Sequence, residues 1–214
     1  MAEHHSVTIR RTTIAFHIYV THPQSAAKVT ALQPFLARLP DEHLSLLYPI
    51  FVMNHKPRGG NGGGTWPLAE VSSSFTHTDQ INNTGIPLVD IQTYVLTPAQ
   101  GIIGLTRDRW ERPMGYLEFS LLHEVAHVIN LRLGLVPHGA TDATFAGMNT
   151  NRCGDGNMIV RRAVECYARY ICRPSAVYHE LPEGETAAQA NSRLIRALRS
   201  SPAFQHVPET WRPN

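Results

Sequence analysis

The chain has 214 residues, 43% of them hydrophobic, and its 19 basic and 17 acidic side chains give a formal net charge of +2. This length and composition allow a buried core in one domain and exclude a disordered tail. The charges form no basic stripe, so we expect no nucleic-acid partner. No apolar run reaches the roughly 18 residues that a membrane span needs, so we expect no membrane contact.

The first five residues lack the charged and apolar regions of a signal peptide. The compartment therefore stays open between the cytoplasm and export by a leaderless secretion system. Three cysteines, Cys153, Cys166 and Cys172, form no CxxC pair and are odd in number, which favours reduced thiols.

In the first third of the chain, apolar residues alternate over 12–20 and predict a strand. Residues 25–39 are expected to form a helix kinked at Pro34, and Asp41 is placed to cap a short helix before a strand at 48–53. The glycine-rich run 56–64 predicts a flexible loop, because it matches neither dinucleotide nor phosphate-loop patterns. Residues 66–83 are also expected to form a loop.

Strands are expected at 91–96 and 102–105, followed by a helix from 115 to 133 that Gly134 ends. Apolar positions cover most of this helix, so it should be central and buried. A second helix is predicted over 157–172, ended by Pro174, and a third over 183–199 with Leu194, Ile195 and Leu198 inward. The tail 202–214 is expected to be loosely attached.

The central helix carries His123-Glu124-Val125-Ala126-His127, an HExxH motif. Residues four apart share one helical face, so both imidazoles can reach one zinc ion. Glu124 would act as general base on a metal-activated water, which then attacks a peptide carbonyl. Two histidines satisfied in a core are the alternative, but burying them beside a carboxylate without a metal is costly.

Catalytic zinc usually takes three protein ligands and a water, so a third ligand is needed. His138, Asp142 and Glu165 are the candidates. His138 could instead be an ordinary loop histidine, and Asp142 could cap a helix. Glu165 has Arg161 and Arg169 at i−4 and i+4, which is also typical of a solvated charge ladder.

The stretch from about 102 to 170 resembles the aspzincin metallopeptidases, the deuterolysin and peptidyl-Lys metalloendopeptidase group. The resemblance rests on HExxH, on Gly139-Ala140-Thr141-Asp142 for a GTxD-like segment, and on the helix around Glu165 and Tyr167. It implies that Asp142 is the third zinc ligand. It also implies that Glu165 lines the pocket for the residue after the scissile bond and selects a basic side chain there.

Two departures from the family pattern stand out. The segment between His127 and Asp142 is longer than in the family, and Phe145 replaces the tyrosine that stabilises the oxyanion. Phenylalanine cannot donate a hydrogen bond, so Tyr167 or His138 would have to do so.

We therefore expect an α+β, zincin-like fold with a small mixed sheet packed on the central HExxH helix and further helices. The chain would be one catalytic domain, 1–214, with an N-terminal part to residue 100, a metal-site core at 101–174 and a C-terminal helix and tail at 175–214. The expected function is a zinc endopeptidase acting on protein or peptide substrates. It could be delivered as a toxin or effector and silenced by an immunity or inhibitor protein. The alternative is a zinc-stabilised binding module without turnover.

Overall fold

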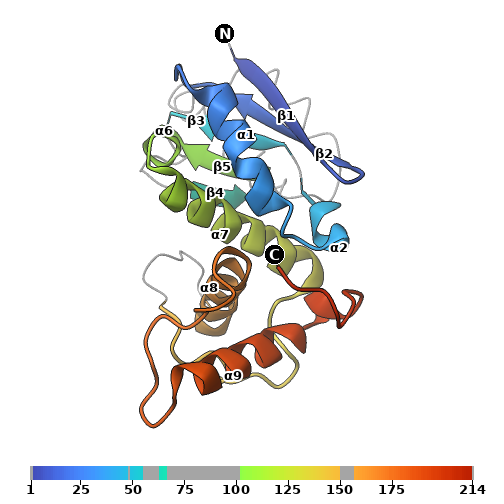
Figure 1. Cartoon of the computed structure of the whole chain (residues 1–214), viewed down its shortest axis with the longest axis vertical. Coiled ribbons are helices and arrows are strands. Elements are labelled where there is room, and N and C mark those ends of the chain that lie inside the picture. The colour runs from blue at the N-terminus through green and yellow to red at the C-terminus, as the bar shows by residue number, and fades with distance from the viewer. Residues whose placement is uncertain (1, 48, 55–62, 67–101, 150–156, 214) are drawn as a thin grey trace.

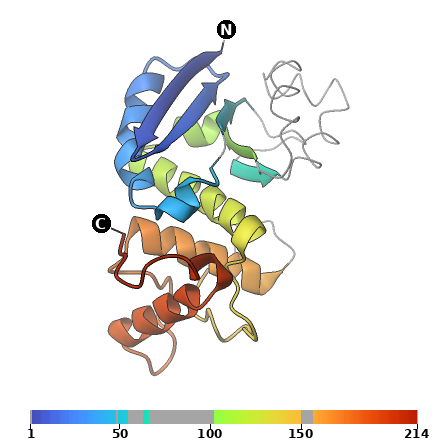
Figure 2. The same cartoon turned by 90° about the vertical axis from the view of Figure 1, so that its right-hand side faces the viewer.

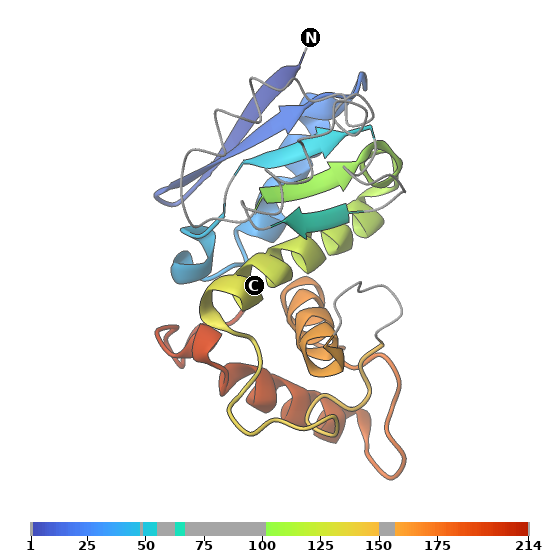
Figure 3. The same cartoon turned by 180° about the vertical axis from the view of Figure 1, so that it is seen from behind.

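The computed structural model describes residues 2–47, 49–54, 63–66, 102–149 and 157–213. It contains a five-stranded sheet in the order β1-β2-β3-β5-β4, seen face-on in Figure 3. The strands are β1 (Glu3–Ile9), β2 (Thr12–Ile18), β3 (Ile50–Met53), β4 (Gly63–Trp66) and β5 (Ile102–Thr106). Strands β2, β3 and β5 run parallel, whereas β1 and β4 at the two edges are antiparallel to their neighbours. The sheet is therefore mixed.

The burial of each strand follows its apolar pattern. In β2, the alternate residues Ile14, Phe16 and Ile18 are all buried in the core. All four residues of β3 are buried, as expected for a strand with a neighbour on both sides. Arg10 makes the tight turn between β1 and β2 at a φ of 53°, a backbone conformation that non-glycine residues seldom adopt.

Helices cover one face of the sheet and extend away from it. They are α1 (Ser25–Leu36), α2 (Asp41–Leu44), α6 (Arg107–Trp110), α7 (Met114–Leu133), α8 (Met158–Cys172), α9 (Ala187–Arg199) and the 3-10 turn η1 (Pro202–Phe204). Helices α1 and α7 lie on the same face, with α7 beside the edge strand β4 (Figures 1 and 3). Helix α8 packs on α7 from the side away from the sheet, and α9 packs on α8 (Figure 2). Helix α7 is thus the central element.

Local sequence signals explain where the long helices begin and end. Helix α7 ends at Gly134, whose φ of 80° breaks the helix. The Asn157 side chain caps α8 by accepting hydrogen bonds from the amides of Ile159 and Val160. Thr186 and Gln189 form a reciprocal capping box at the start of α9.

Most of the expected elements among the described residues are confirmed. The strands predicted at 12–20 and 102–105 are β2 and β5, and the helices predicted at 115–133 and 157–172 are α7 and α8. The helix predicted at 25–39 ends at Leu36, and Pro34 lies inside it. The helix predicted at 183–199 begins only at Ala187 because the Thr186 cap sets its start. The strand predicted at 91–96 lies outside the described residues.

Other expectations need correction. Asp41 does not cap α2 but is its first residue, and its carboxylate pairs with Arg10. The expected loops at 56–64 and 66–83 are wrong at residues 63–64 and 66, which belong to β4, and their other positions lie outside the described residues. Strand β1 and helix α6 were not predicted.

The expectation of a loosely attached tail is wrong. Phe204 is 4% exposed, and its ring centroid lies 5.2 Å from that of His43 and 6.0 Å from that of Trp211. The backbone amide of Ala203 donates a hydrogen bond to the Gly134 carbonyl. Aromatic burial of this kind contributes enough free energy to order a short terminal segment.

No helix in the described part of the chain is long and apolar enough to cross a membrane. Cys166 and Cys172 are free thiols, as predicted, whereas Cys153 lies outside the described residues.

Candidate functional site

Helix α7 places the HExxH residues side by side. The ring centroids of His123 and His127 are 5.0 Å apart, with the ring planes at 74° to each other. His123 and Glu124 are 8% and 7% exposed, and His127 is half-buried. The i, i+4 spacing therefore produces the expected pair of imidazoles with a carboxylate next to the first.

Helix α8 brings a second carboxylate to this pair. Glu165 contacts His123, with 3.5 Å between the Glu165 Oε2 and His123 Nδ1 atoms. The helices are antiparallel here, because Arg169, one turn after Glu165, lies against Phe119, one turn before His123. The contact thus follows from the packing of α7 on α8.

Glu165 is compensated although it is buried. The side chain is 5% exposed, and Arg169 donates a hydrogen bond of 3.0 Å from its Nε atom to the carboxylate. Burial alone raises the pKa of Glu165, but the neighbouring His123 and Arg169 outweigh burial and hold this pKa below its ordinary value. The solvated ladder considered from the sequence is therefore wrong: the arginine is present, but the carboxylate is inside the protein.

Arg169 extends this cluster toward the loops. Its Nη2 atom lies 3.0 Å from the His179 Nδ1 atom, and the His179 Nε2 atom lies 2.9 Å from the nitrogen of the Asn149 side-chain amide. The guanidinium carbon is also 5.6 Å from the Phe119 ring centroid, within cation–π range. Arg169 is consequently held in place from several sides, which fixes the carboxylate it binds.

Asp142 lies in different surroundings. It is exposed, in the loop between α7 and α8, and its backbone carbonyl accepts a hydrogen bond from Arg162. His138, in the same loop, is also exposed. Neither residue has the burial that Glu165 has.

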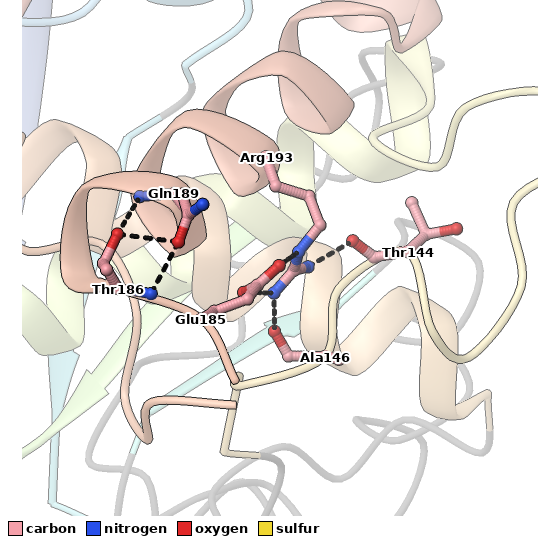
Figure 4. Close-up of polar contacts among 6 residues, drawn as sticks. All are labelled: Thr144, Ala146, Glu185, Thr186, Gln189 and Arg193. Carbon is pink, nitrogen blue, oxygen red and sulfur yellow. Dashed lines mark hydrogen bonds and ion pairs between the residues drawn. The ribbon is translucent and has the colours of Figure 1, made fainter. Parts of the chain in front are cut away.

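Arg193 of α9 holds the segment that follows Asp142. Its guanidinium donates to the carbonyls of Thr144 and Ala146 at 3.1 and 3.0 Å, and it pairs with the Glu185 carboxylate at 2.8 Å (Figure 4). The hydrogen bond and charge of Arg193 hold the pKa of Glu185 below its ordinary value. The loop is thus fastened to α9.

Tyr167 and Phe145 are core residues. Tyr167 is fully buried, and its hydroxyl lies 2.7 Å from the His43 Nδ1 atom. The His43 Nε2–H donates to the Ala203 carbonyl at 2.7 Å, so the Nδ1 atom must accept from the Tyr167 hydroxyl. Phe145 is likewise fully buried. The hydroxyl expected to contact substrate is therefore committed to His43, a partner that no sequence motif indicated.

The two histidines fit one metal ion, but a complete cage is not formed. Two imidazoles at this separation can both reach a zinc ion at about 2.0 to 2.1 Å. Within the described ranges, however, no three His, Cys, Asp or Glu side chains gather into a metal-binding group. The site brings together His123, Glu124, His127 and Glu165, and does not join Asp142 or His138 to them.

Comparison with known proteins adds no relative. The chain matches no family model, no curated protein and no solved structure. The resemblance to the aspzincins therefore stays a prediction.

Proposed function

We propose that the protein is a zinc-dependent endopeptidase of zincin-like architecture. The observation that carries this proposal is the grouping on α7 of His123 and His127, 5.0 Å apart, around the buried Glu124. Two imidazoles on one helical face with a neighbouring carboxylate are the set of groups that a catalytic zinc site uses.

The residues divide the work as follows. His123 and His127 would hold the zinc ion, which when bound polarises a carbonyl and lowers the pKa of water. Glu124 takes the proton from the attacking water and passes it to the leaving amine. Glu165, whose Oε2 atom lies 3.5 Å from the Nδ1 atom of His123, would hold this ring in place and leave its Nε2 atom available to the zinc ion.

This role for Glu165 replaces the one that the resemblance implied. The carboxylate already pairs with Arg169 and contacts His123, so little negative charge is left to select a basic substrate side chain. Asp142 is not assigned as a ligand either, because it is exposed and stands apart from the histidines.

The substrate would lie along the edge of the sheet. Strand β4 is an edge strand that pairs only with β5 among the described strands, and it lies beside α7. An extended peptide can add to such an edge through backbone hydrogen bonds, which places its carbonyls near the helix below. This mode suits a protein or peptide substrate.

One observation favours a second function, a zinc-stabilised binding module without turnover. Phe145 cannot donate a hydrogen bond, and the Tyr167 hydroxyl is engaged by His43. Loss of one oxyanion donor costs about 2.7 to 4 kcal/mol of transition-state stabilisation.

Metal analysis combined with a casein assay separates the two functions. We expect the wild-type chain to bind one zinc ion and cleave casein, and Glu124→Gln to bind zinc with turnover reduced about 100-fold or more. Glu111→Gln is the matched control, because Glu111 is exposed, precedes α7 and forms its ion pair with Arg107, away from the histidines. Zinc binding without turnover in all three proteins would favour the module, and failure to bind zinc would overturn both functions.

A further inference from the structure

A cavity lies between α7 and α8, one helical turn from His123. It has a volume of about 160 Å³ and is lined by Gly115, Tyr116, Phe119, Arg169, Cys172 and Arg173. A cavity of about 150 Å³ can hold a benzene molecule, so this one has room for a single side chain or a chain end. None of the HExxH residues lines it.

The cavity continues the same helix faces that carry the candidate site. Phe119 precedes His123 by four residues, and their ring centroids are 6.4 Å apart. On α8, Arg169 follows Glu165 by four residues and shares its face, and Arg173, the first residue after α8, also lines the cavity. A peptide bound at His123 would reach the cavity within about two or three residues, at roughly 3.3 Å per extended residue.

The charge at the cavity is positive. Arg173 is exposed, and its side chain makes no hydrogen bond or ion pair with the residues that the structure describes, whereas Arg169 is half-buried and pairs with Glu165. The guanidinium carbon of Arg109 lies 6.0 Å from the ring centroid of Tyr116, which lines the cavity. Arg38 donates to the Cys172 carbonyl at 3.0 Å, which adds a fourth guanidinium nearby.

Two carboxylates lie near three of these four arginines: Glu165 is beside Arg169, and Glu118 is near Arg38 and Arg173. Glu165 is paired with Arg169, and burial raises the pKa of Glu118 despite the charges of Arg38 and Arg173. The net charge of these side chains around the cavity is therefore positive. Guanidinium groups bind carboxylates through paired hydrogen bonds. The aromatic rings of Tyr116 and Phe119 supply an apolar wall.

We propose that this cavity is a substrate subsite that binds a peptide carboxylate near the scissile bond. The carboxylate comes from an acidic side chain or from a free C-terminus. The inference rests on the proposed peptidase function for the peptide nature of the ligand. It reverses the charge preference that the sequence resemblance implied.

Peptide binding without turnover tests the proposal. The probes are fluorescein-labelled octapeptides of Gly, Ser and Ala that contain one Glu or one Gln, each with a C-terminal acid or amide. Their affinity for the full chain carrying Glu124→Gln is measured by fluorescence anisotropy. We expect the carboxylate member of a pair to bind about 10-fold to 100-fold more tightly than its neutral match.

The four probes also identify the source of the carboxylate. Discrimination between Glu and Gln assigns the site to an acidic side chain, and discrimination between acid and amide ends assigns it to a C-terminus. Equal affinities across both pairs overturn the proposal. Because no bond is cleaved in this assay, the result does not depend on whether the chain is an active peptidase.

Two variants, each with a matched control, test whether the peptide carboxylate binds in this cavity. Arg173→Glu should abolish the preference, while Arg196→Glu on α9 should preserve it, because Arg196 is exposed and does not line the cavity. Gly115→Leu should fill the cavity and weaken binding at least 10-fold. A Cβ atom at Gly115 meets no atom within 4 Å, so the fold tolerates the change, and Gly115→Ala is the matched control that should still bind.

Protection of Cys172 gives a measurement independent of affinity. In a chain with Cys153→Ser, the remaining thiols are the buried Cys166 and the half-buried Cys172. The carboxylate peptide should slow alkylation of Cys172, and the neutral peptide should not. Equal rates with both peptides would place the bound carboxylate elsewhere and overturn the assignment.

Discussion

The buried polar groups on the two faces of helix α8 differ in charge: those on one face are charged, and those on the other are neutral. On the face toward α7, Glu165 is charged, pairs with the half-buried Arg169 and contacts His123. On the face toward α2 and η1, Tyr167 and His43 are fully buried and neutral, and they bind only each other and a backbone carbonyl. A charged cluster that reaches the surface can serve chemistry, whereas a sealed neutral pair holds the fold together.

The neutral face should give the largest effect, in the pH dependence of stability. Burial lowers the pKa of His43 to about 4, from an ordinary value of 6.5. Between these values the unfolded chain binds a proton that the folded chain does not, so the free energy of unfolding falls as the pH drops from 6.5 to 4 and is fully retained above 6.5. At about 1.36 kcal/mol per pKa unit, this amounts to about 3 kcal/mol.

Urea unfolding across this pH range checks the effect, with His43→Gln as the comparison variant. The variant should be less stable at pH 7 but should lose less stability on acidification. Parallel curves for the two proteins would mean that His43 takes up its proton in the folded state, and the sealed character of this face would then be wrong.

On the charged face, substitution of Glu165 should lower the affinity for zinc. Glu165→Gln removes the charge that orients His123, and loss of such a partner weakens zinc binding about 10-fold to 100-fold. Asp142→Asn should change the affinity less than about twofold and the stability by less than about 0.5 kcal/mol, because Asp142 is an exposed loop residue.

Competition with a chelating dye measures zinc affinity for both variants. Retention of full affinity by Glu165→Gln, together with zinc loss in Asp142→Asn, would restore the ligand set that the aspzincin resemblance implies. It would also show that the loop fastened by Arg193 rearranges when the metal binds.

A smaller effect than that of Glu165→Gln is expected for Tyr167→Phe. Removing the hydroxyl leaves the buried His43 Nδ1 atom without a donor, which should destabilise the fold by about 1 to 2 kcal/mol. Casein cleavage should stay within about twofold of wild type under conditions where the variant is folded. A drop of about 100-fold or more would show instead that this hydroxyl leaves His43 and stabilises the oxyanion.

Sequence periodicity was sufficient to predict the two central helices, α7 and α8. The apolar pattern and Gly134 defined α7, and Asn157 and Pro174 bounded α8. These signals act over one or two turns, so they are readable without the fold. For the same reason, the HExxH spacing alone placed the two imidazoles on one face.

The features that the sequence did not predict depend on tertiary contacts. Arg169 looked like a solvated partner of Glu165 because i, i+4 spacing does not report whether α7 covers the pair. The same limit applies to Tyr167, whose partner His43 lies far away in the sequence. The tail was expected to be loosely attached because terminal segments usually are, yet Phe204 packs against residues from distant segments.

The bond from His43 to the Ala203 carbonyl also has a consequence for the order of folding. It joins residues that are 160 positions apart in the sequence. Contacts of such long range tend to form late, because the entropy of closing the loop is lost before the contact contributes any free energy. We therefore expect η1 to dock against α2 and α8 late in folding.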